Sequence, residues 1–243
     1  MTKGITPSLD ENTRRYYLDV MGIQCWESID SQLKSENHGG VSTVDDSDRD
    51  VAVISHSQIE EAIQRCTRCR LYKTRKQALA GRGNQSAELM FVLLTPNSSD
   101  DESGVICGGE AGVLFGKMLA AIDIKIDDVY LSSLLKCSVP LNHTVSPKEI
   151  QSCNDYLKQQ IQLIRPKLLV VLGETAVRCL LQKDLSIDDY RAMNNDMPYM
   201  HYSQVESVPL FVSYSPEELL QQPENKRKAW SDLQQLQKII DKK

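Results

Sequence analysis

Four cysteines are the residues of this chain whose type and spacing could do chemistry. Cys66 and Cys69 form a CxxC pair, and fifteen residues separate Cys137 from Cys153. A CxxC brings two thiolates within reach of one metal ion, and a second pair could complete a tetrahedral set. In a reducing compartment such a pattern more often indicates metal or redox chemistry than structural disulfides. On spacing alone, zinc and an iron–sulfur cluster both stay open.

The other three cysteines, Cys25, Cys107 and Cys179, are isolated in the sequence. We expect them to be small buried hydrophobic residues, because cysteine is among the most buried residue types.

A basic stretch surrounds the CxxC pair, and no acidic residue lies between Glu61 and Glu88. Positive charge favours thiolates and would offset an anionic metal cluster. The same stretch could instead bind nucleic acid or form a solvated face, and the sequence leaves these alternatives open. Its basic residues are Arg65, Arg68, Arg70, Lys73, Arg75, Lys76 and Arg82.

Composition and charge predict one main domain preceded by a polar arm. The chain has 243 residues, of which 41% are hydrophobic, enough for one sizeable α/β core. Residues 1–54 carry ten acids and five Lys or Arg, whereas residues 55–243 carry 23 of each. We predict a short helical peptide in residues 1–27, a flexible acidic linker in residues 28–54 and an α/β domain in residues 55–243. The chain shows neither a membrane-spanning apolar run nor a secretory signal, so we expect a cytoplasmic protein.

The elements that would position the cysteines alternate between helix and strand from Ser57 onward. Ser57 with Glu60, and Ser146 with Glu149, fit capping boxes that begin helices. Such alternation predicts a mostly parallel sheet with helices on both faces. We expect strands at 88–95, 129–135, 167–172 and 208–212, and helices at 57–66, 110–122, 146–164, 174–181 and 224–240.

A family resemblance extends from about residue 60 to residue 236. The residues that carry it are CTRCRLYKTRKQALAGRG (66–83), DDESG (100–104), GGEAGVLFGKML (108–119), VYLSSLLKCSVP (129–140), the run from Ser146 to Ala176, SYSPEELLQQP (213–223) and WSDLQ (230–234). These segments resemble the family 4, or iron–sulfur, uracil-DNA glycosylases. The resemblance implies a three-layer α/β/α fold with a short, mostly parallel central sheet. It also implies a [4Fe-4S] cluster on Cys66, Cys69, Cys137 and Cys153, with zinc the less favoured metal.

The chain departs from that family's pattern at the positions expected to do chemistry. The sequence Leu93-Leu94-Thr95-Pro96-Asn97 replaces a GEAPG-type motif whose acidic residue aids attack by water. Cys107 replaces an aromatic residue that stacks on the base, Ser133 an asparagine that reads it, and Ser215 a histidine that stabilises the departing base. We therefore expect no catalysis. The alternative is a glycosylase of altered specificity that uses Asn97, Ser133 or Ser215 in new roles.

The N-terminal residues 12–26 form a candidate partner-binding peptide. Apolar side chains gather on one face of a short helix there, and such a helix is marginal alone in water. The segment resembles the N-terminal peptide of the psi subunit of bacterial DNA polymerase III, especially of pseudomonad type. The resemblance implies docking through Arg14, Arg15, Tyr17, Leu18, Met21, Ile23 and Trp26. The competing interpretation is that the peptide packs on its own domain.

Together these features predict a non-catalytic accessory subunit of the DNA polymerase III clamp loader. Such an adaptor would join the tau/gamma subunits to the chi subunit, and so to single-stranded-DNA-binding protein, during DNA replication. It would bind DNA itself weakly or not at all. One alternative is a family 4-like DNA glycosylase that removes uracil or another deaminated base in DNA repair. A second alternative is a DNA-binding module built on residues 65–82.

Overall fold

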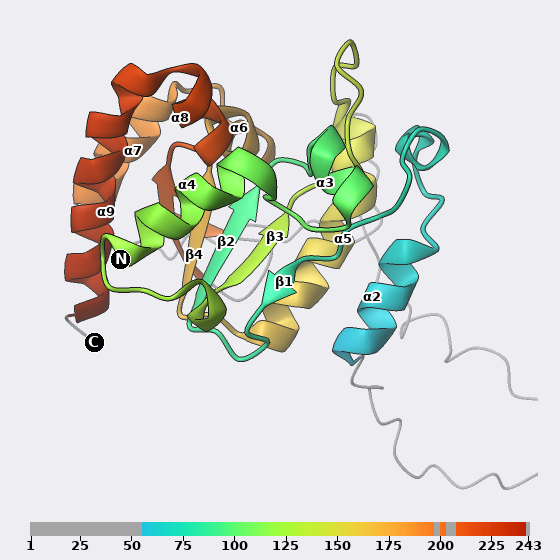
Figure 1. The fold of residues 1–243 in the computed structure, drawn as a ribbon, viewed down its shortest axis with the longest axis horizontal. Helices are drawn as coiled ribbons and strands as arrows, with labels where there is room; N and C mark the ends of the chain where they lie inside the picture. The colour runs from blue at the N-terminus through green and yellow to red at the C-terminus, as the bar shows by residue number, and fades with distance from the viewer. Residues whose placement is uncertain (1–54, 197–199, 203–207, 242–243) are drawn as a thin grey trace, which may run out of the picture. The chain divides into compact units, whose positions relative to one another are not determined.

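A six-stranded, mostly parallel sheet forms the centre of the domain (Figure 1). The computed structural model describes residues 55–196, 200–202 and 208–241. The strand order is β1-β3-β2-β4-β6-β5. The four inner strands are parallel, whereas the edge strands β1 and β5 run antiparallel to their neighbours. The strands are β1 (Arg82–Gly83), β2 (Leu89–Leu93), β3 (Tyr130–Ser133), β4 (Leu168–Leu172), β5 (Met200–Tyr202) and β6 (Val208–Ser213).

Helices cover both faces of this sheet, which confirms the predicted three-layer α/β/α architecture. The described helices are α2 (His56–Gln64), α3 (Ser98–Ser103), α4 (Gly109–Ala120), α5 (Pro147–Ile164), α6 (Glu174–Leu181), α7 (Ile187–Asp196), α8 (Pro216–Gln221) and α9 (Lys226–Asp241). On one face, α4 and α9 pack on alternate strand residues, and Phe115 of α4 meets Phe91 of β2 edge to face at 5.2 Å. On the other face, α5 reaches β3 through a hydrogen bond between Gln160 and Ser132. The hydrophobic core therefore lies in two layers, as a sheet buried on both faces requires.

Local sequence signals explain most of these elements. The capping box of α5 forms as predicted, with the Ser146 side chain accepting from the Glu149 N–H and Pro147 at the first helical position. The box predicted for the first helix is wrong by two residues, because Ser55 and Gln58 form it rather than Ser57 and Glu60. Ser55 has the extended backbone of an N-cap, whereas Ser57 already lies within the helix.

The carboxyl ends of β2, β3, β4 and β6 meet at one edge of the sheet because these strands are parallel. We call the segments that follow them, residues 94–109, 133–135 and 213–218, the carboxyl edge. The second region lies between α2 and α5, where a smaller buried cluster of side chains packs apart from the main core. We call the four cysteines of this region, with Arg75 and Lys136, the cysteine corner.

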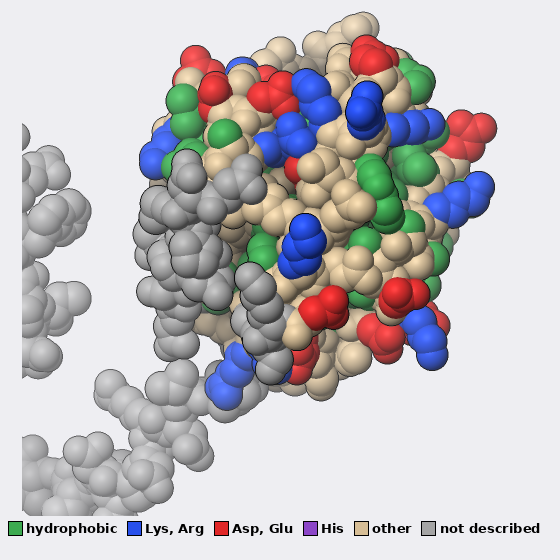
Figure 2. Space-filling view, turned by 90° about the vertical axis from the view of Figure 1, so that its left-hand side faces the viewer, with side chains coloured by type: hydrophobic (Ala, Val, Ile, Leu, Met, Phe, Trp, Pro, Cys, Tyr) green, Lys and Arg blue, Asp and Glu red, His purple; other side chains and the backbone are tan. Residues whose placement is uncertain are grey.

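Charged side chains on the face formed by α7 and α9 are mixed in sign, as Figure 2 shows. Arg191 of α7 forms a two-pronged ion pair with the buried Asp232 of α9, and both bonds are 2.7 Å long. Lys228 and Arg191 also share Asp188. These pairs join α7 to α9. Among the described helices, none combines the length and the apolar character that crossing a membrane would require.

Candidate functional site

The four predicted cysteines line one small cavity at the cysteine corner. Cys66 and Cys69 come from the loop after α2, Cys137 follows β3, and Cys153 lies on α5. Cys137 and Cys153 are buried, whereas Cys66 and Cys69 are partly exposed. Within the described residues, no three His, Cys, Asp or Glu side chains form a set that could hold a metal ion.

The guanidinium of Arg75 joins two sides of this cavity. Its Nη1 donates to the Cys137 Sγ at 2.9 Å. Its Nη2 donates to the backbone carbonyls of Gln64 and Cys66 at 2.9 and 2.8 Å. One side chain thus ties the CxxC loop to the segment after β3.

Lys136 places a second cation against the cysteines, and its side chain is wholly buried. Its Nζ donates to the Ser132 hydroxyl, the Ser133 carbonyl and the Gln160 side-chain oxygen, all within 2.7 Å. Burial lowers the pKa of Lys136 to about 7, against the opposing effect of the nearby Cys153. Because none of its three acceptors is a carboxylate, the ammonium lacks the counter-ion that a buried cation normally has.

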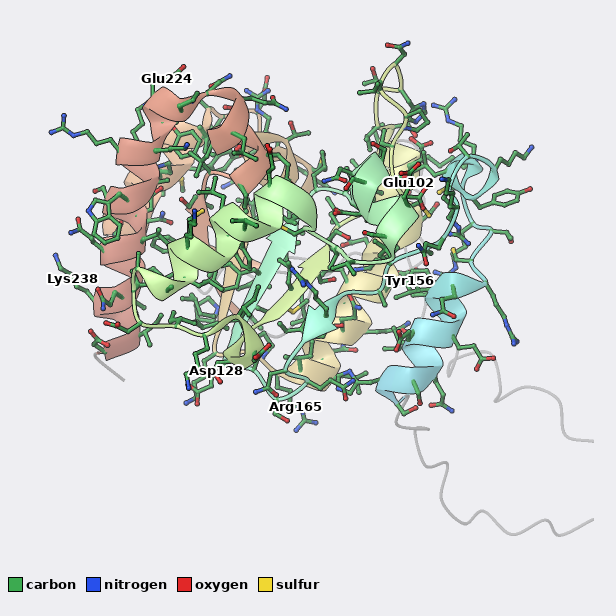
Figure 3. The ribbon with its side chains drawn as sticks, viewed as in Figure 1. Glu102, Asp128, Tyr156, Arg165, Glu224 and Lys238 are labelled. Carbon is green, nitrogen blue, oxygen red and sulfur yellow. The ribbon has the colours of Figure 1, made fainter. Side chains whose placement is uncertain are left out.

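The rest of the basic stretch is mostly engaged with acidic side chains. Arg65 pairs with Glu61, Arg68 with Asp155, and Lys76 with Glu102. Figure 3 shows Glu102 on α3 and Tyr156 on α5, and the Arg68 guanidinium lies 4.8 Å from the Tyr156 ring centre. Each of these three cations therefore has an acidic neighbour, so the stretch is not a patch of unpaired positive charge.

A buried carboxylate fixes the loop that leads from Cys137 to α5. The Glu149 side chain accepts hydrogen bonds from Arg70, from His143 and from the backbone and hydroxyl of Ser146. Burial alone would raise the pKa of Glu149, but these hydrogen bonds outweigh it and lower the pKa to about 2. The loop projects from the domain and carries a fully exposed Leu141 (Figure 1).

At the carboxyl edge, the segment Leu93-Leu94-Thr95-Pro96-Asn97, which replaces the GEAPG-type motif, ends in the cap of a helix. The Asn97 side chain accepts from the Asp100 N–H at 2.8 Å and begins α3. Asp100 is buried, and its carboxylate accepts from the backbone N–H groups of Asn97, Cys107 and Gly108. Leu94 is half-buried and offers no polar group beyond its backbone. The segment is thus held by Asp100, whose structural role the sequence analysis missed.

The other replaced positions are likewise used by the fold. The Ser133 hydroxyl is fully buried and donates to the Leu135 carbonyl at 2.6 Å. Ser215 caps α8 by accepting from the Glu218 N–H at 3.2 Å. Cys107 is buried with φ +52°, and burial raises the pKa of its thiol to about 12. The buried state predicted for Cys107 is confirmed, and the related prediction for Cys179 holds only in part because that residue is half-buried.

Glu217 is a carboxylate of this edge that sequence reasoning did not single out. It is the second residue of α8 and is half-buried. Burial raises its pKa, and the charges of Asp100 and Glu218 raise it further. Its charge also acts on the Cys107 thiol. The signal in the sequence was a Glu directly after Ser215-Pro216, but only the fold brings it beside Cys107.

A groove of about 850 Å³ lies between α5 and α6, outside both regions. Its lining shares no residue with the carboxyl edge or with the cysteine corner. We therefore keep the candidate site at these two regions.

The chain matches the model of a known protein family. The family model of the uracil DNA glycosylase superfamily matches residues 80–234, more than half of the chain. The chain belongs to the uracil-DNA glycosylase superfamily. Members of this superfamily also match in full-length comparison. A type-4 uracil-DNA glycosylase of Archaeoglobus fulgidus is 32% identical over 190 residues, which cover 78% of this chain and 95% of that protein.

Two further relatives carry the same name. The type-4 uracil-DNA glycosylase of Sulfurisphaera tokodaii is 28% identical over 190 residues, covering 76% of this chain and 84% of the relative. That of Saccharolobus solfataricus is 35% identical over 126 residues, covering 51% of this chain and 58% of the relative. The resemblance to iron–sulfur glycosylases is therefore confirmed at the level of the superfamily.

These relatives overturn the prediction of a non-catalytic clamp-loader subunit of DNA polymerase III. The resemblance to psi subunits rested on residues 12–26, whereas the likeness to glycosylases extends over 190 residues. The glycosylases are named as enzymes, so the expectation of no catalysis is also wrong. The predicted partners, namely the tau/gamma subunits, the chi subunit and single-stranded-DNA-binding protein, fall with that assignment. So does the expectation of weak or absent DNA binding.

The residues predicted for partner docking lie outside the described part of the chain. They are Arg14, Arg15, Tyr17, Leu18, Met21, Ile23 and Trp26. Cys25 lies in the same segment.

Proposed function

We propose that this chain is a DNA glycosylase of the type-4 class that removes uracil or another deaminated base from DNA. The observation that carries the proposal is the likeness to a type-4 uracil-DNA glycosylase over 95% of that relative's length. The proposed catalytic domain is residues 55–243, preceded by a linker at 28–54 and a peptide at 1–27.

Glu217 is the carboxylate to which we assign the chemistry. Excision requires the base to be flipped out of the stack and into a pocket. The bond between base and sugar then breaks, a water oxygen bonds to the sugar carbon, and the base leaves with the electron pair. A carboxylate with a raised pKa beside that carbon accepts the proton of the water more readily at neutral pH. Leu94 cannot take this role, and Glu217 shares the carboxyl edge with Cys107, the position that resembles the base-stacking residue.

The cysteine corner fits an anionic iron–sulfur group, and we propose a [4Fe-4S] cluster on Cys66, Cys69, Cys137 and Cys153. Arg75 donates to one of these sulfurs, and the buried Lys136 lacks a carboxylate partner, so the cavity suits a negatively charged occupant. Four thiolates could also bind zinc. The likeness to type-4 uracil-DNA glycosylases supports the iron–sulfur cluster over zinc. When bound, the group would cross-link the α2 loop, the segment after β3 and α5.

A single-turnover excision assay tests the proposed activity. The full chain, in excess over substrate, is incubated with single-stranded and mismatched DNA that contains uracil, hypoxanthine or xanthine. We expect release of at least one of these bases above the enzyme-free control. If none is released from any substrate, the proposal is wrong.

Glu217→Gln tests the assigned residue within the same assay. Because general-base catalysis typically contributes about 10²–10⁴-fold, we expect a loss of that size in the rate of excision. Glu224→Gln is the matched control, since Glu224 is exposed near the end of α8. An E217Q rate equal to that of E224Q would remove Glu217 from the chemistry but leave the activity itself established.

A further inference from the structure

Arg75 differs from most cations of the basic stretch in its partners. Arg65, Arg68 and Lys76 each pair with a carboxylate. Among the described residues, no carboxylate pairs with Arg75, whose three acceptors are two backbone carbonyls and the Cys137 sulfur. The positive charge of Arg75 therefore remains available to the thiols of the cysteine corner.

The three hydrogen bonds of Arg75 span the two halves of the cysteine set. The carbonyls of Gln64 and Cys66 belong to the turn that presents the CxxC pair, and Cys137 belongs to the segment after β3. The guanidinium is planar, so its two terminal nitrogens hold their acceptors at a fixed separation and direction. A Lys ammonium is a single point with a flexible stem and cannot donate to both sides in the same way.

We propose that Arg75 is a positioning residue that sets the distance between the CxxC loop and Cys137 and stabilises the iron–sulfur group held there. This inference rests on the proposed [4Fe-4S] cluster but not on base excision. A donor to a ligating sulfur also withdraws negative charge from the cluster, which raises its reduction potential. Arg75 therefore acts on both the retention and the potential of the cluster without being a ligand.

Lys136 supplies an internal comparison. It lines the same cavity, and its backbone N–H bonds to Cys153. Its ammonium, however, donates its hydrogen bonds to Ser132, Ser133 and Gln160. Arg75 alone of these two side chains donates directly to a cysteine sulfur, so its removal should have the larger effect on the sulfur ligands.

The test compares full-length wild type, Arg75→Met, Arg75→Lys and the control Arg65→Met, all purified without oxygen. Among the described residues, exposed Arg65 pairs only with Glu61 and does not line the cavity, so R65M makes the same chemical change outside the cavity lining. Iron and sulfide per chain, the rate at which the visible absorption fades in air, and the reduction potential are measured in the absence of DNA. Loss of an outer-shell partner typically costs about 10–100-fold in metal affinity.

We expect R75M to lose its cluster at least about tenfold faster than wild type and to show a lower reduction potential. R75K keeps the positive charge but loses the planar guanidinium that donates to both sides of the cavity. Its rate of cluster loss and its reduction potential should therefore lie between those of R75M and wild type. Both values for R65M should match wild type. If R75M does not fold, R75K decides the question, and wild-type cluster retention and potential in R75K would overturn the proposal. Wild-type values in a folded R75M, or a wild-type protein that binds zinc or no metal, would also overturn it. Failure of base excision alone would not.

Discussion

The cysteine corner and the carboxyl edge treat their polar side chains in opposite ways. At the cysteine corner, Arg75 and Lys136 approach four thiols, and no carboxylate of the described residues pairs with either side chain. At the carboxyl edge, Asn97 and Ser215 cap helices and the Ser133 hydroxyl is bonded inside the chain. The first region has unbalanced positive charge around a cavity, whereas the polar groups of the second region form hydrogen bonds that stabilise the fold.

This difference shows that the two regions use their polar side chains for different purposes. A set of ligands works only as a whole, and its supporting cations must lie beside it. Helix capping accepts several residue types, so a Ser or Asn can take over a backbone contact at the edge without unfolding the domain. Glu217 is a half-buried acid of this edge whose charge acts on the Cys107 thiol, which is why the proposed chemistry depends on it.

The largest expected effect comes from removing the acid that holds the carboxyl edge. Asp100→Ala leaves three backbone N–H groups, those of Asn97, Cys107 and Gly108, without their acceptor. Each buried donor left unsatisfied costs about 1–3 kcal/mol, so we expect the free energy of unfolding to fall by about 3–5 kcal/mol. Urea denaturation measures it.

Asp128→Ala is the control for this change, because Asp128 is exposed at the opposite end of the domain (Figure 3). Its loss should stay within about 0.5 kcal/mol. Equal stability of D100A and D128A would show that Asp100 does not hold the edge.

A pair of glycines in α4 tests how tightly Cys107 is packed. A Cβ at Gly112 would lie 2.2 Å from the Cys107 carbonyl oxygen, whereas a Cβ at Gly116 would meet nothing within 4 Å. We expect Gly112→Ala to lower the free energy of unfolding by about 1–3 kcal/mol through overpacking. Gly116→Ala should raise it by about 0.5–1 kcal/mol, because alanine favours a helix more than glycine does. Urea denaturation measures the stability of both variants. Equal stability of G112A and G116A would contradict this packing.

A further effect concerns Glu149, beside the cysteine corner, and depends on pH. The hydrogen bonds of Glu149 lower its pKa in the folded chain to about 2, from an ordinary value of 4.5. A lowered folded pKa stabilises the fold above the unfolded pKa, and this stabilisation is lost as the pH falls through the folded value. We expect Glu149→Gln to cost on the order of 2 kcal/mol at neutral pH and progressively less between about pH 4.5 and pH 2. Urea denaturation across that range measures it, and a cost that does not change with pH would count against the lowered pKa.

The sequence predicted those elements whose signals are local and long. The apolar runs at 88–95 and 167–172 became β2 and β4, and the Ser146 capping box began α5. It missed β1 and β5, which have two and three residues and so carry no usable alternation. It also missed the short helices α3 and α8, whose caps are Asn97 and Ser215, because six residues are too few for a helical apolar period.

By itself, the sequence determined that four cysteines at a distinctive spacing belong to an α/β domain of the glycosylase type. The cysteine spacing and the apolar runs can be recognised without knowing any contact. Only the tertiary structure decided what surrounds them. Arg75 lies 62 residues from Cys137 in the chain, and Glu217 lies far from Cys107, yet each pair interacts. Parallel strands bring distant segments to one edge of a sheet, and the resulting pairing of charges cannot be read from neighbouring residues.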